Sequence, residues 1–87
     1  MSKKPNMVLR KALFDIVRKQ VRGDNPPETR VTLERLMAAG HTREEAVELI
    51  AMVVSSEIFD VLKEMQPYNE SRYVSALRAL PRLPWDD

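Results

Sequence analysis

The stretch from Arg43 to Met65 constrains the fold of this chain more than any other. Its apolar residues recur at intervals of three and four, the spacing that places them on one side of an α-helix. A helix that is apolar over most of its circumference is buried by more than one neighbour. We therefore expect a long helix over 43–65 that is the centre of an all-α bundle or half of a subunit interface. Its main apolar stripe would consist of Ala46, Val47, Ile50, Val53, Val54, Ile58, Val61 and Met65, with Leu49, Met52 and Phe59 on the flanks.

The stretch "GHTREEAVELI", residues 40–50, begins this helix. Gly40 stands where a preceding helix ends and a positive φ is needed, which glycine adopts without steric strain. Thr42 and Glu45 have the spacing of a capping box, in which each side chain bonds the backbone N–H of the other residue. His41 lies between the two caps, and we expect its ring to pack on Leu36. The stretch is therefore interpreted as a corner between two helices.

Proline, glycine and capping residues divide the remaining sequence into three shorter helices, over about 7–22, 26–39 and 70–80. Asp24 or Asn25 is the expected N-cap of the second helix. Asn69 is the expected N-cap of the fourth helix. The inner face of the first helix would carry Leu9, Ala12, Leu13, Ile16, Val17 and Gln20.

Two features complete the predicted fold. Tyr68 should pack on Tyr73 as a hydrophobic staple at the start of the fourth helix. Pro81 and Pro84 exclude helix from the tail, residues 81–87, which we expect to be extended. The sequence as a whole predicts a compact four-helix bundle, built from αα-hairpins as a single domain over residues 1–87, with the long third helix at its centre.

Composition excludes several chemistries. The chain has 87 residues, no cysteine and one histidine, so disulfides and thiol nucleophiles are excluded and metal ligands are few. A core of this size has a thin stability margin, and small proteins often gain stability from a partner subunit. The longest apolar run, Ile50 to Val54, is too short for a membrane span, and no secretory signal is apparent. We expect a soluble, cytoplasmic protein that needs no cofactor.

The charge is distributed unevenly. The net charge is +1, yet residues 1–22 hold seven basic side chains against Asp15 alone. Such a face can bind nucleic-acid phosphates. However, we expect no aromatic residues to interleave with these charges, so attraction to the acidic third helix is the favoured explanation. The basic face comprises Lys3, Lys4, Lys11, Arg18, Lys19 and Arg22.

Three glutamates in the third helix are candidate acids. Glu44 and Glu48 are four residues apart, as two metal ligands would be, but hard cations need more oxygen ligands than these two supply. Glu57 projects into the apolar stripe, where an ionised carboxylate needs a partner. We expect a structural ion pair or hydrogen bond between Glu57 and another helix. Acid–base catalysis by these residues would need a cleft that the sequence does not indicate, so the chain is interpreted as a non-enzyme.

Three segments together carry a family resemblance. "NPPETRVTLERLMAAG", "REEAVELIAMVVSSEIFDVLKE" and "PYNESRYVSALRALP" resemble a family of short bacterial helical proteins grouped as a domain of unknown function, over nearly the whole chain. The resemblance implies a bacterial, cytoplasmic, all-α protein and supplies no activity. It also implies a metal site in members with histidines at the positions of Phe14, Glu44 and Glu48. This chain has no histidine at those positions, so no metal is expected.

The functional expectation follows from the large part of the third helix's circumference that is apolar. A chain of this size cannot cover all of that helix. We expect a non-catalytic protein-interaction module that self-associates, most simply as a homodimer. The alternatives are a nucleic-acid accessory protein that uses the basic first helix, or a metal-binding member of its family for which His41, Glu44 and Glu48 are the candidate ligands.

Overall fold

The computed structural model describes residues 7–86, with side chains from residue 9 onward, and within that range it consists of helices, turns and loops. The four helices are α1 (Met7–Gly23), α2 (Pro27–Ala38), α3 (Arg43–Glu64) and α4 (Glu70–Ala79). Each boundary lies within one residue of the boundary expected from sequence. The predicted all-α four-helix bundle is therefore confirmed.

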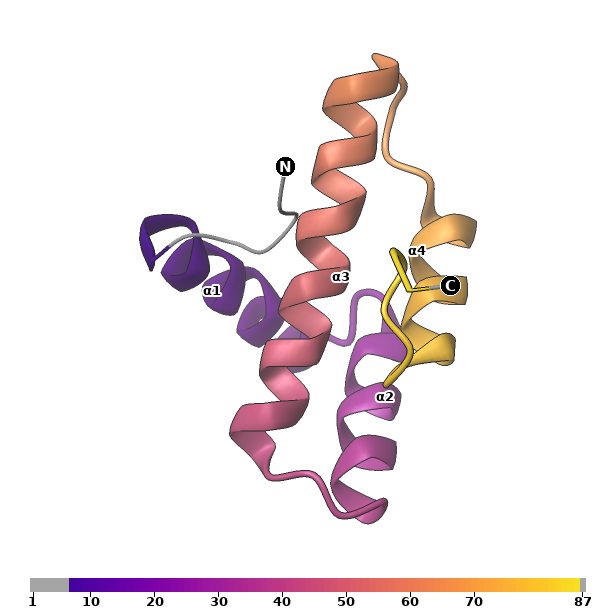
Figure 1. Cartoon of the computed structure of the whole chain (residues 1–87). Helices are drawn as coiled ribbons and strands as arrows, with labels where there is room; N and C mark the ends of the chain where they lie inside the picture. Colours follow the sequence, from indigo (N-terminus) through magenta and orange to yellow (C-terminus); the bar gives the residue numbers. More distant parts are fainter. Residues whose placement is uncertain (1–6, 87) are drawn as a thin grey trace.

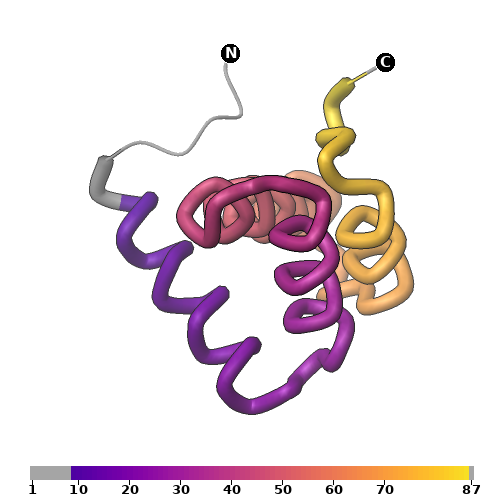
Figure 2. The backbone as a smooth tube through the Cα atoms, turned by 90° about the horizontal axis from the view of Figure 1, so that it is seen from below, coloured from indigo at the N-terminus to yellow at the C-terminus, as the bar shows by residue number. Residues whose placement is uncertain are grey.

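The helices are arranged around α2 and α3. These two run antiparallel as one αα-hairpin, and α4 returns antiparallel to α3 on the other side of the connection at residues 65–69 (Figure 1). Figure 2 looks approximately along α3 and shows α1 lying across the other helices at a steep angle. Among the described residues, α2 and α3 each contact all three other helices. The long third helix is thus central, as expected, but it shares that position with α2.

The core lies where the four helices meet. Its fully buried members come from every helix, but the apolar stripes predicted for α1 and α3 also continue to exposed residues such as Leu9 and Ile58. Val17 contributes from α1, Leu36 from α2 and Ile50 from α3. Leu77 and Leu80 contribute from α4 and its end. Arg35 of α2 fixes that end, because its guanidinium donates to the carbonyl oxygens of Leu77 and Leu80 at 3.1 and 2.9 Å.

The corner between α2 and α3 has the geometry expected from "GHTREE". Gly40 has a φ of 110°, and the N–H groups of Gly40 and His41 donate to the carbonyl oxygens of Met37 and Leu36, both at 3.1 Å. These two bonds form a Schellman motif. Thr42 and Glu45 form a complete capping box, with bonds of 2.8 and 3.0 Å. The corner is therefore stabilised by hydrogen bonds between residues that are close together in the sequence.

Two local expectations are wrong. The N-cap of α2 is Pro26, which makes no side-chain capping bond, and neither Asp24 nor Asn25 caps this helix. Asp24 has a positive φ of 53° and pairs with Arg30 instead, because the chain reverses tightly before Pro26. The tail is also not extended. Residues 80–86 form turns, in which the N–H of Asp86 donates to the carbonyl of Leu83 and Leu83 packs on the core.

Candidate functional site

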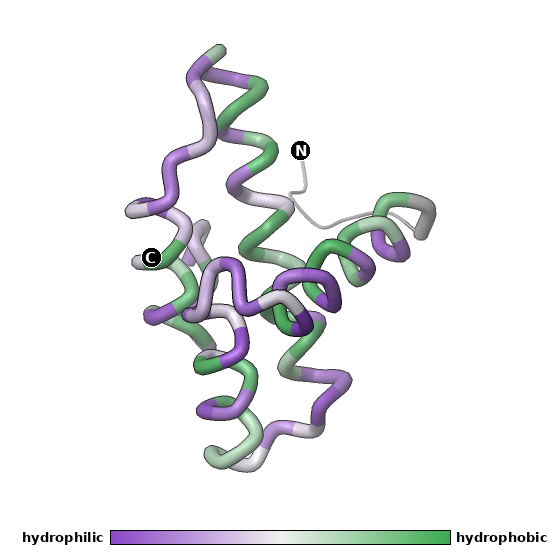
Figure 3. Tube along the Cα trace, turned by 180° about the vertical axis from the view of Figure 1, so that it is seen from behind, coloured by the Kyte–Doolittle hydropathy of each residue, from purple (hydrophilic) through white to green (hydrophobic). Residues whose placement is uncertain are grey.

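The two halves of α3 differ in how they are covered. In the first half, the side that carries Val47, Ala51 and Val54 packs against the rest of the bundle. The last turns of α3 rise beyond α1 and α4 (Figure 1), and hydrophobic residues continue along this projecting part (Figure 3). The face is one apolar stripe along α3, and within the described residues its internal partners lie along the first half of the helix.

Three residues define the uncovered part of this face, which we call the apolar strip. They are Ile58, Leu62 and Met65, which are 42%, 70% and 86% exposed. Their spacing of four and three residues keeps them on one side of the helix. Phe59 on one flank is also exposed, at 45%, and the Lys63 ammonium lies 5.9 Å from the centre of its ring. Exposed apolar patches are typical of protein, membrane or ligand contact sites.

A small hollow opens beside the strip, where α1, α3 and the start of α4 meet. Its volume is about 180 Å³, and almost all of its surface is apolar. Val54 and Ile58 form its α3 wall, and Ile16 forms its α1 wall. The remaining lining residues are Gln20, Glu57, Tyr68 and Tyr73.

Two of these lining residues, Gln20 and Tyr73, form a hydrogen-bonded group with Thr29. The Gln20 side-chain oxygen accepts hydrogen bonds from the Tyr73 hydroxyl at 2.7 Å and from the Thr29 hydroxyl at 2.8 Å. Burial raises the pKa of Tyr73 to about 12, although its hydrogen bonds to Thr29 and Gln20 act in the opposite direction. Tyr73 is therefore a neutral donor that ties α4 to α1. Gln20 was placed on the inner face of the first helix from sequence, but its two partners come from distant segments that periodicity cannot identify.

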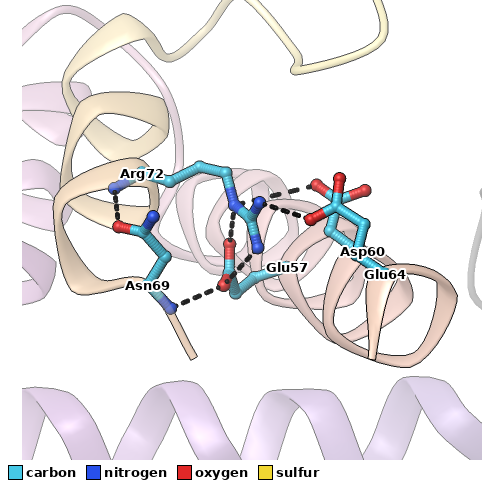
Figure 4. A network of polar contacts seen from close by, with 5 residues as sticks. All are labelled: Glu57, Asp60, Glu64, Asn69 and Arg72. Carbon is cyan, nitrogen blue, oxygen red and sulfur yellow. Dashed lines mark hydrogen bonds and ion pairs between the residues drawn. The ribbon is translucent and has the colours of Figure 1, made fainter. Parts of the chain in front are cut away.

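Glu57 is the central acceptor of a second polar cluster. This residue is only 7% exposed, and its carboxylate accepts two hydrogen bonds from the Arg72 guanidinium, at 2.9 and 3.0 Å (Figure 4). It also accepts the backbone N–H of Asn69 at 3.1 Å. Arg72 bonds Glu64 as well, at 3.0 Å, and lies 4.0 Å from Asp60. Glu57 thus has the ion-pair partner from another helix that a buried acid requires.

The protonation state of Glu57 follows from these contacts. Burial raises the pKa of this carboxyl, but the hydrogen bonds from Arg72 and Asn69 and the positive charge of Arg72 outweigh burial, so the pKa lies below its ordinary value. The acidic partners raise the pKa of Arg72 in turn. Both groups are charged at neutral pH. The pair therefore acts as a permanent tie between α3 and α4, and not as a proton donor or acceptor.

Tyr68 is positioned by this tie. It lies in the short connection between α3 and α4, next to Asn69, and its ring meets that of Tyr73 edge to face at a centroid distance of 5.9 Å. The expected staple between the two tyrosines is therefore present, although Tyr68 remains 51% exposed. Partial burial and the nearby acids raise the pKa of Tyr68. A neutral aromatic ring thus forms one rim of the hollow.

The candidate metal ligands do not form a metal site in the part of the chain described. No group of three His, Cys, Asp or Glu residues in residues 7–86 could hold a metal ion. Glu48 pairs with Arg10 at 2.6 Å, and the Arg10 guanidinium also lies 5.1 Å from the centre of the Phe14 ring. Glu44 is exposed and shares a surface depression with Phe14. His41 is about one-third exposed, and its Nδ1 lies 4.0 Å from Glu45.

The basic face of α1 departs from expectation in two ways. Lys11, Arg18, Lys19 and Arg22 are all exposed, and within the described residues the α1–α3 ion pair is made by Arg10, which was not among them. Arg18 pairs with Asp15 of its own helix at 2.9 Å. Lys3 and Lys4 lie outside the described residues.

The second departure concerns the aromatic residue of α1. Phe14 lies between Arg10 and Arg18, whose guanidinium carbons are 5.1 and 6.0 Å from its ring centre. An aromatic ring is therefore set among the basic residues after all. The expectation failed because Arg10 and Arg18, one turn away on either side of Phe14, bring their charges to its ring.

Comparisons with known proteins add no family assignment. No family model matches the chain, and neither the curated proteins nor the solved structures provide a match. Among the described residues, no helix is long and apolar enough to cross a membrane.

Proposed function

We propose that this protein is a non-catalytic interaction module that self-associates through the apolar strip at the end of α3. The observation that carries the proposal is the change along one face of this helix. Ala51 is 1% exposed, whereas Leu62, eleven residues later and about 20° round the helix on the same side, is 70% exposed. An internal partner covers the first residue, and a second copy would cover the other.

The amount of exposed surface supports association between two copies. The exposed parts of the strip, Phe59 and Tyr68 together amount to roughly 600 Å² in one copy, so that a pair would remove about 1,200 Å² from water. This area is at the lower end of the range for specific interfaces. The proposal thus describes a modest, reversible dimer.

The surroundings of the strip favour binding over catalysis. Glu57 is the most buried acid of the region, and its carboxylate already has three hydrogen-bond donors. A general acid or base needs a pKa near the working pH, whereas the pKa of Glu57 is lowered. In keeping with the sequence resemblance, we place this module in the cytoplasm of a bacterial cell.

Light scattering over a range of concentrations from the low micromolar upward tests the proposal. We expect the molar mass to rise from that of a 10.1 kDa monomer toward twice that value as concentration increases. A strict monomer throughout this range would count against self-association.

A second candidate function is binding of nucleic-acid phosphates by α1. The observation that favours it is the Phe14 ring between Arg10 and Arg18, next to exposed Lys11. Cations beside an aromatic ring are a common surface for single-stranded nucleic acid. A gel-shift assay with single-stranded and duplex DNA and RNA tests this function, because phosphate binding weakens steeply as salt rises. The absence of any shift at low salt would rule it out.

A further inference from the structure

The hollow and the outer end of the apolar strip both involve α3, but they lie at different positions along its axis. The α3 wall of the hollow spans Val54 to Ile58, whereas the outer end of the strip spans Leu62 to Met65. At a rise of 1.5 Å per residue, the two centres are separated by roughly 11 Å along the helix axis. One copy of the protein therefore carries both a recess and a projection, side by side on one surface.

We infer that two copies associate with their α3 helices antiparallel, so that the outer end of each strip covers the hollow of the other copy. This inference rests on the proposed self-association and specifies its geometry. A two-fold axis that passes near the level of residue 60 brings each Leu62 to Met65 segment opposite the partner's hollow. Such an interface is isologous, because each copy uses the same residues as recess and as projection.

The hollow has the size and chemistry for this occupant. An apolar cavity of about 150 Å³ accommodates benzene, so a hollow of about 180 Å³ admits one leucine or methionine side chain. Methionine adapts to irregular spaces, because its side chain is unbranched and flexible. A projection that fills a recess is also the usual form of an energetic hot spot at an interface.

The polar groups that border the hollow would tolerate an apolar occupant. Gln20 already accepts from Tyr73 and Thr29, and Glu57 is already bonded to Arg72. Within the described residues, no buried side-chain nitrogen or oxygen lacks a hydrogen-bond partner. Removal of water from the hollow therefore leaves the Gln20 side-chain oxygen and the Glu57 carboxylate with their hydrogen bonds, so the desolvation of these acceptors carries little penalty.

A parallel arrangement of the two helices does not achieve this match. Each residue of α3 would face the same residue of the partner, so that hollow would face hollow and the Met65 side chains would meet each other. Both recesses would then stay open. The antiparallel arrangement is preferred because it fills both hollows with surface that is otherwise exposed.

Single cysteines in a chain that has none distinguish the two arrangements. With the two-fold axis near residue 60, Ile58 of one copy lies opposite Leu62 of the other. Two copies of the same residue, by contrast, are offset by roughly 6 Å along the helix axes. This offset adds to the spacing between the helices, so the two Cα atoms lie farther apart than the distance of about 7 Å that a disulfide can bridge. The variants are Ile58→Cys and Leu62→Cys, one of them carrying a tag that changes its mass, and each is first shown to be folded by circular dichroism.

The expected result is that a mixture of the two variants, oxidised under mild conditions, forms disulfide-linked dimers with one chain of each kind. Either variant alone should give at least fivefold less linked dimer. Efficient linkage of each variant with itself would indicate a parallel pair and overturn the inference, although self-association would stand. A parent chain that is monomeric in light scattering, with no linkage in any sample, would contradict the proposed function itself.

A second variant tests whether the hollow is used. Ile16→Trp places a larger side chain on the α1 wall of the hollow, and we expect it to weaken dimerisation at least tenfold. The control is Val31→Trp, which alters a residue that is 60% exposed on α2, away from the hollow. Equal dimerisation of the two variants, with a parent chain that dimerises, would overturn the inference.

Discussion

The two ends of α3 are held by different kinds of contact. At its start, Gly40 provides the positive φ and Thr42 and Glu45 bond one another, all within six residues. At its end, Met65 adopts a left-handed conformation with a φ of 55° although it is not glycine. The chain there is fixed by Glu57, which bonds Asn69 and Arg72, 12 and 15 residues further along. The first end is determined by neighbours in sequence, and the second by tertiary contacts.

This difference has a functional consequence. The start of α3 is joined directly to α2 and packs into the core, where Ala46 and Ile50 are fully buried. The end of α3 leaves its apolar strip in solvent, and the hydrogen bonds of Glu57 with Arg72 and Asn69 hold the connection to α4. The proposed interface therefore lies on the end that is fixed by tertiary contacts.

The largest effect is expected at Glu57. Glu57→Gln keeps the shape of the side chain but removes its charge and weakens the hydrogen bonds from Arg72 and Asn69. Hydrogen bonds to a charged group contribute about 1.5–3 kcal/mol, so we expect the free energy of unfolding at pH 7 to fall by about 2–3 kcal/mol. Urea denaturation of parent and variant measures this change. A loss below about 0.5 kcal/mol would mean that the ion pair does not hold the end of α3.

The effect of Glu57→Gln should depend on pH. The pKa of Glu57 in the folded state is below the ordinary value of 4.5, so the ionised carboxylate stabilises the fold at any pH above that value. As the pH falls below 4.5 and through the folded-state pKa, this stabilisation is lost. The difference in Tm between parent and variant should therefore be constant near neutrality and shrink in acid. A difference that grows in acid would contradict the assigned charge state.

The next effect is expected at Gly40, at the start of α3. Gly40→Val forces a β-branched residue into a φ of 110°, and such strain costs about 2 kcal/mol. Apart from Gly40 and its chain neighbours, no heavy atom of the described residues lies within 4 Å of an added Cβ, so the expected loss is attributed to the backbone conformation. The matched control is Gly23→Ala, at the end of α1, where there is equal space and no positive φ. Thermal melts that show equal losses for both variants would contradict this explanation.

The two N-caps should have similar individual effects but different couplings. Thr42→Ala and Asn69→Ala each remove one capping bond and should each lower the free energy of unfolding by about 1 kcal/mol. Combined with Glu57→Gln, Thr42→Ala should be additive, because the sites are distant and share no partner. Asn69→Ala should be non-additive by about 0.5 kcal/mol or more, because the Asn69 side chain caps the backbone N–H of Arg72, whose guanidinium donates to Glu57. Double-mutant cycles in urea measure both couplings.

The smallest effects are expected at the two acids of the first turns of α3. Glu48→Gln removes the ion pair with Arg10, which is partly exposed, and should lower the free energy of unfolding by about 0.5 kcal/mol. Glu44→Gln should change it by less than about 0.3 kcal/mol, because Glu44 is on the surface. Thermal melts at low and high salt check the pair, since only the Glu48 effect should diminish with salt. A bound divalent metal that both substitutions release would identify these residues as ligands instead.

The start of α3 could be predicted from sequence because its signals are local. Gly40, Thr42 and Glu45 each have one favoured structural role at that spacing, and the structure has all three in those roles. The four helices were predicted for the same reason, since their apolar periodicity and their breaks are read from adjacent residues. The N-cap of α2 was predicted wrongly because Asp24 pairs with Arg30, a contact that capping patterns do not include.

The candidate site could be predicted only in part. Glu57 stood out because an acid interrupts an apolar stripe, and the sequence indicates that such an acid needs a partner. The identity of Arg72 depends on how α4 packs against α3, which has no signal in a single sequence. The same holds for the hollow, because Ile16 and Tyr73 are brought together only by the crossing of α1. Periodicity showed that α3 is apolar all round, but not that its last turns project beyond α1.

The measurement that tests the central claim most directly is sedimentation equilibrium of two matched charge insertions, Leu62→Glu and Val31→Glu. The two parent residues are similarly exposed, at 70% and 60%, but only Leu62 lies in the apolar strip. A buried, unpaired carboxylate costs several kcal/mol, and each 1.4 kcal/mol is a factor of ten, so Leu62→Glu should raise the dimer dissociation constant by about a hundredfold or more. Val31→Glu should leave this constant within about twofold of the parent value, because a charge on an exposed surface outside the interface changes the free energy of dimerisation by less than about 0.4 kcal/mol. Equal dissociation constants for the two variants would contradict the claim that the end of α3 is the interface.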